Sequence, residues 1–200
     1  MTDPTQPERF RVLHVCTGNI CRSPMGEQMM TAGLAQRLGA EAVAFDVASA
    51  GTMGYTGAPM EAFALSSLAR YAIDGSAFRA RELVADLVVS ADLVLAATRE
   101  HRAAAVVMHP RAAARTFTLR EFDRLCSAVD PASLPTGDLV ERGRALVRAA
   151  AANRGLVPPA SPRDDDIEDP YQGPEAGFAS CAALVHATLQ RPLDLLAGAR

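Results

Sequence analysis

Lysine is absent from this chain of 200 residues, in which arginine fills all 20 of the lysine and arginine positions. Catalysis by a lysine side chain, such as Schiff-base formation, is therefore excluded. The 23 acidic residues leave a net charge of −3, which gives no reason to expect nucleic acid as a partner. The sequence also contains no apolar run of the roughly 20 residues that a membrane-spanning helix needs.

Cysteine is scarce, with four residues at positions 16, 21, 126 and 181. A chain of this size without a signal peptide is not expected to build a disulfide framework. No Cys-x-x-Cys or Cys/His spacing indicates a zinc site. The first eight residues are polar and contain proline, so we expect residues 1–10 to form a disordered tail rather than a secretory signal. A reducing, cytoplasmic environment is the resulting expectation.

The hydrophobic pattern predicts a single α/β domain over residues 11–200. Short apolar runs that predict strands alternate with segments whose apolar residues recur at helical spacing. The predicted strands cover residues 11–15, 43–48, 91–97 and 115–119. The predicted helices cover residues 24–38, 59–71, 81–88, 99–108, 137–153 and 177–196. This alternation is typical of a central four-stranded parallel sheet with helices on both faces.

The segment from Cys16 to Pro24 follows the first predicted strand and opens the first predicted helix. A glycine-bearing loop in this position points backbone N–H groups at an anion. Arg22 adds a planar guanidinium that can hold two phosphate oxygens at once. The same positive field favours the thiolate form of Cys16, which is the nucleophilic form. Ser23 can donate a hydrogen bond to that sulfur. These residues predict a phosphate site with a nucleophile at its base.

The nine residues CTGNICRSP resemble the signature loop of the low-molecular-weight protein-tyrosine phosphatases, as found in bacterial, actinobacterial-like members. The resemblance implies hydrolysis of phosphotyrosine through a cysteinyl-phosphate intermediate, without metal or other cofactor. It implies a phosphotyrosine-containing protein as partner, such as a bacterial tyrosine kinase or one of its substrates. Compared with this family, residues 123–163 are expected to be an insertion. The residues implied to bind phosphate beside Arg22 are Thr17, Gly18, Asn19, Ile20, Cys21 and Ser23.

Such a reaction also needs an acid, because the departing phenolate oxygen must take up a proton. The family carries this acid in an Asp-Pro-aromatic loop before the last helix, and Asp169-Pro170-Tyr171 stands in that place. The resemblance therefore implies that Asp169 is the general acid and base. Pro170 biases Asp169 toward an extended backbone, and Tyr171 is expected to stack on a phenyl ring. Asp166 and Glu168 are competing carboxylates whose positions match the pattern less well.

Three further residues receive roles from the resemblance. Ser49 is implied to hydrogen-bond Asn19, with a simple turn-forming serine as the alternative. Tyr55 stands where the family carries an aromatic residue that shapes substrate choice, and a packed surface tyrosine is the alternative. Cys21 is implied to form a reversible disulfide with Cys16 that protects the nucleophile from oxidation, whereas a small buried residue is the simpler interpretation.

Two positions depart from the family pattern. Phe78 replaces a histidine that braces the phosphate loop, and because phenylalanine neither donates nor accepts a hydrogen bond, the bracing must come from elsewhere. Gln172 replaces a second aromatic residue after Asp-Pro-Tyr, which predicts a more polar pocket wall. The four histidines have no partner identifiable from the sequence and are interpreted as structural or solvated, at positions 14, 101, 109 and 186.

Other functions stay open at this point. Arsenate fits the same loop, but a thiol relay needs two more neighbouring cysteines, and Cys126 and Cys181 are far apart in the sequence. Phosphoarginine hydrolysis is disfavoured by Ile20, because relatives with that preference have threonine there. A phosphotyrosine-binding pseudo-enzyme is the alternative from a different class, and only Phe78 and Gln172 support it.

Overall fold

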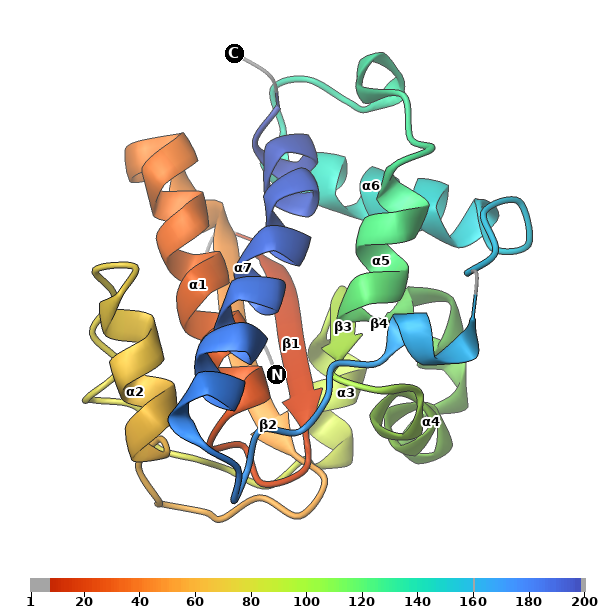
Figure 1. Ribbon diagram of the computed structural model, residues 1–200. Helices are drawn as coiled ribbons and strands as arrows, with labels where there is room; N and C mark the ends of the chain where they lie inside the picture. Colours follow the sequence, from red (N-terminus) through yellow and green to blue (C-terminus); the bar gives the residue numbers. More distant parts are fainter. Residues whose placement is uncertain (1–7, 160, 199–200) are drawn as a thin grey trace.

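The computed structural model describes residues 8–159 and 161–198, and in this part of the chain four parallel strands form one sheet (Figure 1). Their order across the sheet is β2–β1–β3–β4. The strands are β1 (Phe10–Cys16), β2 (Phe45–Gly51), β3 (Leu93–Ala96) and β4 (Thr116–Thr118). The predicted fold class is confirmed. Of the predicted tail, residues 1–7 lie outside the described residues, while Phe10 begins β1 and is fully buried.

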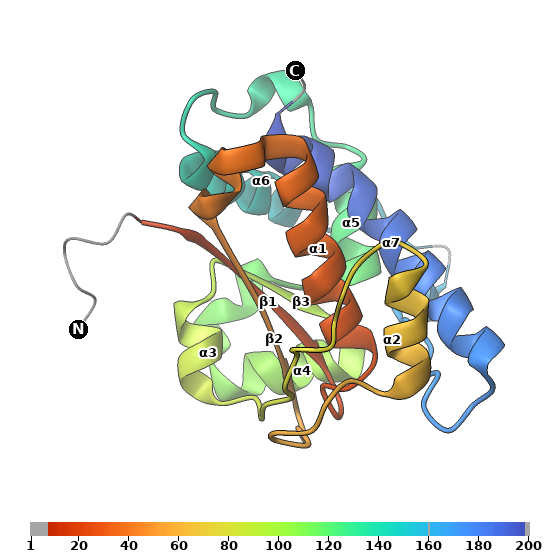
Figure 2. The same cartoon turned by 90° about the vertical axis from the view of Figure 1, so that its left-hand side faces the viewer.

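Alternating side chains of β1 enter two separate apolar cores. Val12 faces the larger core, to which α1 (Arg22–Leu38), α5 (Leu119–Cys126) and α7 (Glu175–Ala197) contribute. Leu13 and Val15 face a smaller core, closed by α3 (Ala85–Ser90) and α4 (Arg99–Met108). Figure 2 shows these two helical layers on opposite sides of the sheet. A strand buried on both faces explains why the first predicted strand reads as almost continuously apolar.

Two further helices pack around the larger core. Helix α2 (Ala62–Ala69) lies against α7, and α6 (Leu139–Ala152) packs against both α5 and α7. Short 3-10 helices cover η1 (Gly39–Ala44), η2 (Pro110–Arg115), η3 (Pro131–Ser133) and η4 (Pro162–Asp165). None of the described helices is both long and apolar enough to cross a bilayer.

The element boundaries correct several predictions. Residues 43–44 belong to η1, and Ser49, for which a turn was the alternative, lies inside β2. Residues 81–84 are not helical, because Glu82 forms a bridge with Gly51 and α3 begins only at Ala85. Helix α5 was not predicted. Its N-terminus carries a signal that would have identified it, a capping box between Thr118 and Glu121.

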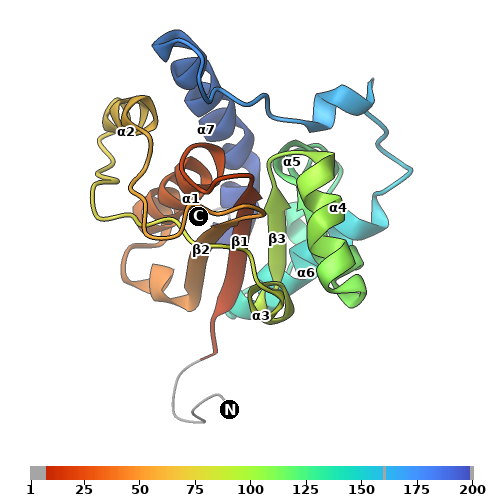
Figure 3. The same cartoon turned by 90° about the horizontal axis from the view of Figure 1, so that it is seen from below.

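The carboxyl ends of the parallel strands meet at one edge of the sheet, toward which the arrow of β1 points in Figure 3. The loop between β1 and α1 lies at this end, and the segment that leads into α7 passes beside it (Figure 1). Because β1 is a central strand and its neighbours run in the same direction, their loops converge on the residues after Cys16.

Candidate active site

The thiol of Cys16 lies at the base of the loop between β1 and α1. Cys16 is only 2% exposed, and its Sγ is 2.9 Å from Oγ of Ser23 in the first turn of α1. The predicted contact between the serine hydroxyl and the sulfur is therefore present. The loop is also tied to the chain after β2, because the amides of Thr52 and Met53 donate to the carbonyls of Cys16 and Thr17.

Asn19 holds the loop in shape from behind. Its backbone is in the left-handed region with φ of 57°, and it is fully buried. Asparagine tolerates this conformation better than most residues. Its Nδ2 donates to Ser23 at 2.9 Å and to Ser49 at 2.8 Å, while its Oδ1 accepts from the amide of Arg81 at 2.8 Å. The side-chain nitrogen and oxygen of Asn19 are thus both bonded to groups that keep the loop folded.

The bracing that a histidine would supply comes from Glu27 and Arg81. The Ser49 hydroxyl donates a hydrogen bond to the Glu27 carboxylate at 2.6 Å. The Arg81 guanidinium donates one to the Ser49 carbonyl at 2.7 Å. Burial raises the pKa of Glu27, although the hydrogen bond from Ser49 opposes this shift. Phe78 packs against the larger core instead of joining the network.

Gly51, at the end of β2, is required by the same packing. A Cβ atom at this position would lie 2.3 Å from the carbonyl oxygen of Thr17 and 2.9 Å from the amide nitrogen of Asn19. Both are backbone atoms that cannot rotate away. Only glycine lets the phosphate loop lie this close to the neighbouring strand.

Arg22 directs its guanidinium at the loop and at the segment before α7. The residue is 6% exposed, and its Nη1 donates to the carbonyl of Ile167 at 3.2 Å. Its Nη2 donates to Asp169 Oδ2 at 2.5 Å and to Thr17 Oγ1 at 3.4 Å. Its Nε is buried without a hydrogen-bond partner among the described residues. A buried unpaired donor is costly, so this atom is suited to receive an anionic oxygen.

Asp169 approaches the loop from the opposite side and is held less firmly. The amide of Ile167 donates to the carbonyl of Ala97, which attaches the segment to the end of β3. Beyond that point the Asp169 side chain is 45% exposed. Of the competing carboxylates, Asp166 accepts from the amide of Arg99 and Glu168 is exposed. Neither of them lines the cavity that contains Cys16.

Above Cys16 is a small cavity of about 60 Å³. Tyr55 and Tyr171 flank it and are each about half exposed. Gln172 is exposed in the left-handed conformation and does not line the cavity, so the expected polar wall is absent there. Asn19 and Ser23 do not line the cavity. The residues that line the cavity are Cys16, Thr17, Gly18, Ile20, Cys21, Arg22, Tyr55, Asp169 and Tyr171.

His101 belongs to this site and was missed at the sequence level. Its Nε2 is 2.8 Å from Oγ1 of Thr17, and its Nδ1 is 2.7 Å from Oγ1 of Thr98. Burial, and then the positive charge of Arg22, lower the pKa of His101 to about 4, so the ring is neutral at pH 7. A neutral imidazole offers one donor and one acceptor, which suits two hydroxyl partners. No sequence signal joins positions 17 and 101, because they meet only through the sheet.

The four cysteines are all free and buried. Cys21 lines the cavity, and burial raises its pKa above the ordinary value. Burial also raises the pKa of Cys126 and that of Cys181, the latter to about 12. These three residues are therefore neutral thiols at pH 7. Over residues 8–159 and 161–198, no cluster of His, Cys, Asp or Glu is arranged to hold a metal ion.

Comparison with known proteins agrees with this geometry. The sequence model of the family "Low molecular weight phosphotyrosine protein phosphatase" matches residues 11–137, which include the loop after β1. A low molecular weight protein-tyrosine-phosphatase of Streptomyces coelicolor is 32% identical over 181 residues, or 89% of this chain and 88% of that protein.

The chain is also similar to a solved structure and to a phosphatase with a different named substrate. The crystal structure of a low molecular weight protein tyrosine phosphatase from T. tengcongensis has a TM-score of 0.66 and 28% identity, covering 92% of this chain and 98% of that one. A protein-arginine-phosphatase of Geobacillus stearothermophilus is 33% identical over 113 residues, or 56% of this chain and 71% of that protein.

Proposed function

The chain belongs to the low molecular weight phosphotyrosine protein phosphatase family and is a protein-tyrosine phosphatase, and we propose that Cys16, Arg22 and Asp169 carry its chemistry. The observation that supports these roles most directly is the meeting of all three at one small cavity, from segments 147 residues apart in the chain. The phosphate oxygens bind to the loop amides and to Arg22, including its unpaired Nε. The tyrosyl ring lies between Tyr55 and Tyr171.

The first step transfers the phosphoryl group to sulfur. The Cys16 thiolate attacks phosphorus, the S–P bond forms, and the bond between phosphorus and the phenolic oxygen breaks. The protonated carboxyl of Asp169 gives its proton to that oxygen, so the leaving group departs as a neutral phenol. Arg22 and the loop amides hold the charge of the transferring group throughout.

The second step returns the enzyme to its starting state. The carboxylate of Asp169 takes a proton from water, the water oxygen bonds to phosphorus, and the S–P bond breaks to release inorganic phosphate. Cys16 leaves as a thiolate, which the Ser23 hydroxyl stabilises from 2.9 Å. The reaction therefore needs no other donor or acceptor of protons.

The ion pair between Arg22 and Asp169 adds a feature to this cycle. Both the carboxylate and an incoming phosphate oxygen are partners for Nη2 of Arg22. The carboxylate and the substrate phosphate therefore compete for this guanidinium.

Phosphoarginine is the competing substrate, because the Geobacillus relative is a protein-arginine-phosphatase. Ile20 lines the cavity and offers an apolar contact, which suits a phenyl ring better than a guanidinium. We propose a phosphotyrosine-containing protein in the cytoplasm as the natural partner, such as a tyrosine kinase or one of its substrates. Four free thiols in the described chain agree with a reducing compartment.

The test compares phenyl phosphate with p-nitrophenyl phosphate, whose leaving group needs less protonation, from pH 4 to pH 9. Cys16→Ser should abolish both reactions. Asp169→Asn should slow phenyl phosphate hydrolysis by about 100-fold or more and p-nitrophenyl phosphate hydrolysis much less. The same variant should bind inorganic phosphate more tightly, since Arg22 loses its competing carboxylate.

Glu168→Gln is the matched control, because it removes an exposed neighbouring carboxylate outside the cavity. It should leave both rates and phosphate binding unchanged. If Asp169→Asn slowed the hydrolysis of both substrates by the same factor, Asp169 would not be the general acid. Faster turnover of phosphoarginine than of phosphotyrosine by the wild type would overturn the assigned specificity.

A further inference from the structure

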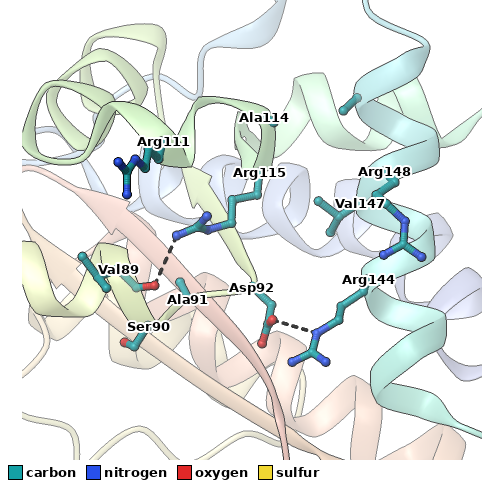
Figure 4. Close-up of a pocket in the computed structure, with 11 residues that line it drawn as sticks. Val89, Ser90, Ala91, Asp92, Arg111, Ala114, Arg115, Arg144, Val147 and Arg148 are labelled. Atoms are coloured by element: carbon teal, nitrogen blue, oxygen red, sulfur yellow. Dashed lines mark hydrogen bonds and ion pairs between the residues drawn. The ribbon is translucent and has the colours of Figure 1, made fainter.

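A second cavity lies at the other end of the sheet and is lined by four arginines. Its volume is about 520 Å³, within the roughly 300–1,000 Å³ of small-molecule sites. Arg111 and Arg115 come from η2, and Arg144 and Arg148 from α6. Figure 4 shows these two pairs on either side of the cavity. Its position beside the residues that precede β3 separates it from the phosphate loop, which lies at the carboxyl ends of the strands.

The charges around this cavity do not balance. Asp92 is the only acidic residue among those that line it. Its Oδ1 accepts from Arg144 at 3.1 Å and its Oδ2 from the amide of Arg11 at 2.9 Å, so it is committed to the protein. Outside the lining, Glu8 pairs with Arg144 and Glu141 with Arg148. Three carboxylates thus serve two of the four arginines.

Arg111 and Arg115 have no carboxylate partner among the described residues. Arg115 donates its Nη2 to the carbonyls of Val88 and Val89, at 3.4 and 3.2 Å, where α3 ends. Its Nε is buried and has no hydrogen-bond partner. In the described part of the chain, only one other buried side-chain nitrogen or oxygen is unpaired in this way, the Nε of Arg22 in the phosphate site.

The rest of the lining is small and apolar. Between the arginines lie Val89, Ala91, Ala114, Val147 and Ala151. Such a surface excludes water from one side of a ligand without donating to it, and guanidinium planes stack on flat rings. The combination of two guanidiniums without a carboxylate partner among the described residues, a net positive lining and an apolar floor fits an anion that also has an apolar part.

We propose that this arginine cavity binds a small molecule carrying two or more linked phosphate groups, of the nucleoside di- or triphosphate class. The phosphates lie between Arg111, Arg115 and Arg148, and the base and sugar lie over the alanine and valine side chains. Arginine can hold phosphate oxygens through bidentate contacts. The site is separate from the phosphatase reaction and does not depend on it.

The experiment follows backbone amide shifts of the whole protein by NMR during titration with ATP, tripolyphosphate and adenosine in turn, with ligand integrity checked by phosphorus NMR. We expect ATP to shift residues 89–92, 111–115 and 144–151, with an affinity that falls as salt is added. Tripolyphosphate should shift the same residues, and adenosine alone should bind much more weakly.

The deciding variants are Arg111→Gln and Arg148→Gln, because both residues are exposed and neither holds a backbone carbonyl. Together they should raise the Kd for ATP at least about tenfold. Arg70→Gln, an exposed arginine elsewhere, is the matched control and should change nothing. Arg115→Lys keeps the charge and tests the contribution of the planar guanidinium separately, again with weaker binding expected.

Two results would overturn the proposal. One is amide shifts confined to residues 16–23, which would place every phosphate ligand in the active site. The other is an unchanged affinity at residues 89–92 and 144–151 in the double variant, which would mean that these arginines do not recognise the anion.

Discussion

The two halves of the active site differ in how firmly the fold holds them. The phosphate loop is fixed by hydrogen bonds from three directions: Ser23 in α1, Ser49 in β2 and the amide of Arg81. The acid segment is attached at Ile167, and beyond that point the side chains of Glu168, Asp169 and Tyr171 are exposed. The nucleophile is thus part of the core, whereas the acid lies on a surface segment.

This difference matches what each half has to do. The loop must present its N–H groups in one geometry, since preorganised donors stabilise the transition state without having to reorganise. Asp169 must give up a proton, take one back and change its hydrogen-bond partner during one turnover. A buried and fully hydrogen-bonded carboxylate could not do this. The buried half therefore keeps the N–H donors in a fixed geometry, and the exposed half lets Asp169 exchange protons with substrate and water.

The largest expected effect comes from breaking the loop. Asn19→Ala removes hydrogen bonds to Ser23, Ser49 and Arg81, each worth on the order of 1 kcal/mol or more, and leaves the amide of Arg81 without its side-chain acceptor. It also places alanine at φ of 57°, which is unfavourable for that residue. We expect kcat/KM to fall by about 100-fold or more and the melting temperature to drop.

Ser49→Ala serves as the graded control, because it removes only one of these contacts together with the bond to Glu27. Its loss of kcat/KM should be clearly smaller. If Asn19→Ala kept wild-type activity while Asp169→Asn did not, the firm hydrogen bonding of the phosphate loop would not be what its function depends on.

The local patterns of both halves were recognisable in the sequence. The strand before Cys16, the anion-binding loop and the Asp-Pro-Tyr segment are local patterns, because backbone conformation and residue type together define them. The four strands were predicted within a few residues for the same reason. Helix α5 was missed although Thr118 and Glu121 carry its capping signal.

Contacts that depend on tertiary packing could not be predicted in this way. The substitution of Phe78 showed that some other group must brace the loop, but not that Glu27 and the Arg81 amide do so. His101 reaches Thr17 across 84 positions of sequence. The arginine cavity likewise joins η2 to α6, and no local pattern relates these segments.

An intermediate effect is expected at the aromatic rim. Tyr171 is about half exposed beside the cavity, so its truncation should not unfold the protein. Tyr171→Ala removes a ring that can stack on the substrate, which should raise KM for phenyl phosphate by about fivefold to tenfold while kcat changes less. Tyr171→Phe keeps the ring and should restore KM. A similar rise in KM for an alkyl phosphate would show that Tyr171 positions the segment and does not recognise the phenyl group.

The smallest expected effect on rate concerns His101, which joins the phosphate loop to the start of α4. His101→Ala loses the contact to Thr17, whose hydroxyl also accepts a hydrogen bond from Arg22. We expect kcat/KM to fall a few-fold, in line with about 1 kcal/mol for a buried hydrogen bond. His101→Gln retains a donor and an acceptor and should recover most of the rate. His109→Gln, at a histidine without a side-chain partner in the described structure, should have no effect.

His101 should also influence how stability depends on pH. Because burial and Arg22 lower its pKa to about 4, the folded protein keeps it neutral at pH values where the unfolded chain, with a pKa of 6.5, is protonated. The unfolded state therefore binds more protons between pH 6.5 and pH 4, and the free energy of unfolding decreases as the pH falls through this range. His101→Gln cannot titrate, so its stability should decrease less between pH 7 and pH 4.5 in denaturant titrations. Since His14, whose pKa burial lowers to about 3, is present in both proteins, the difference between them isolates His101, and identical slopes would mean that its ring is not held neutral against the phosphate loop.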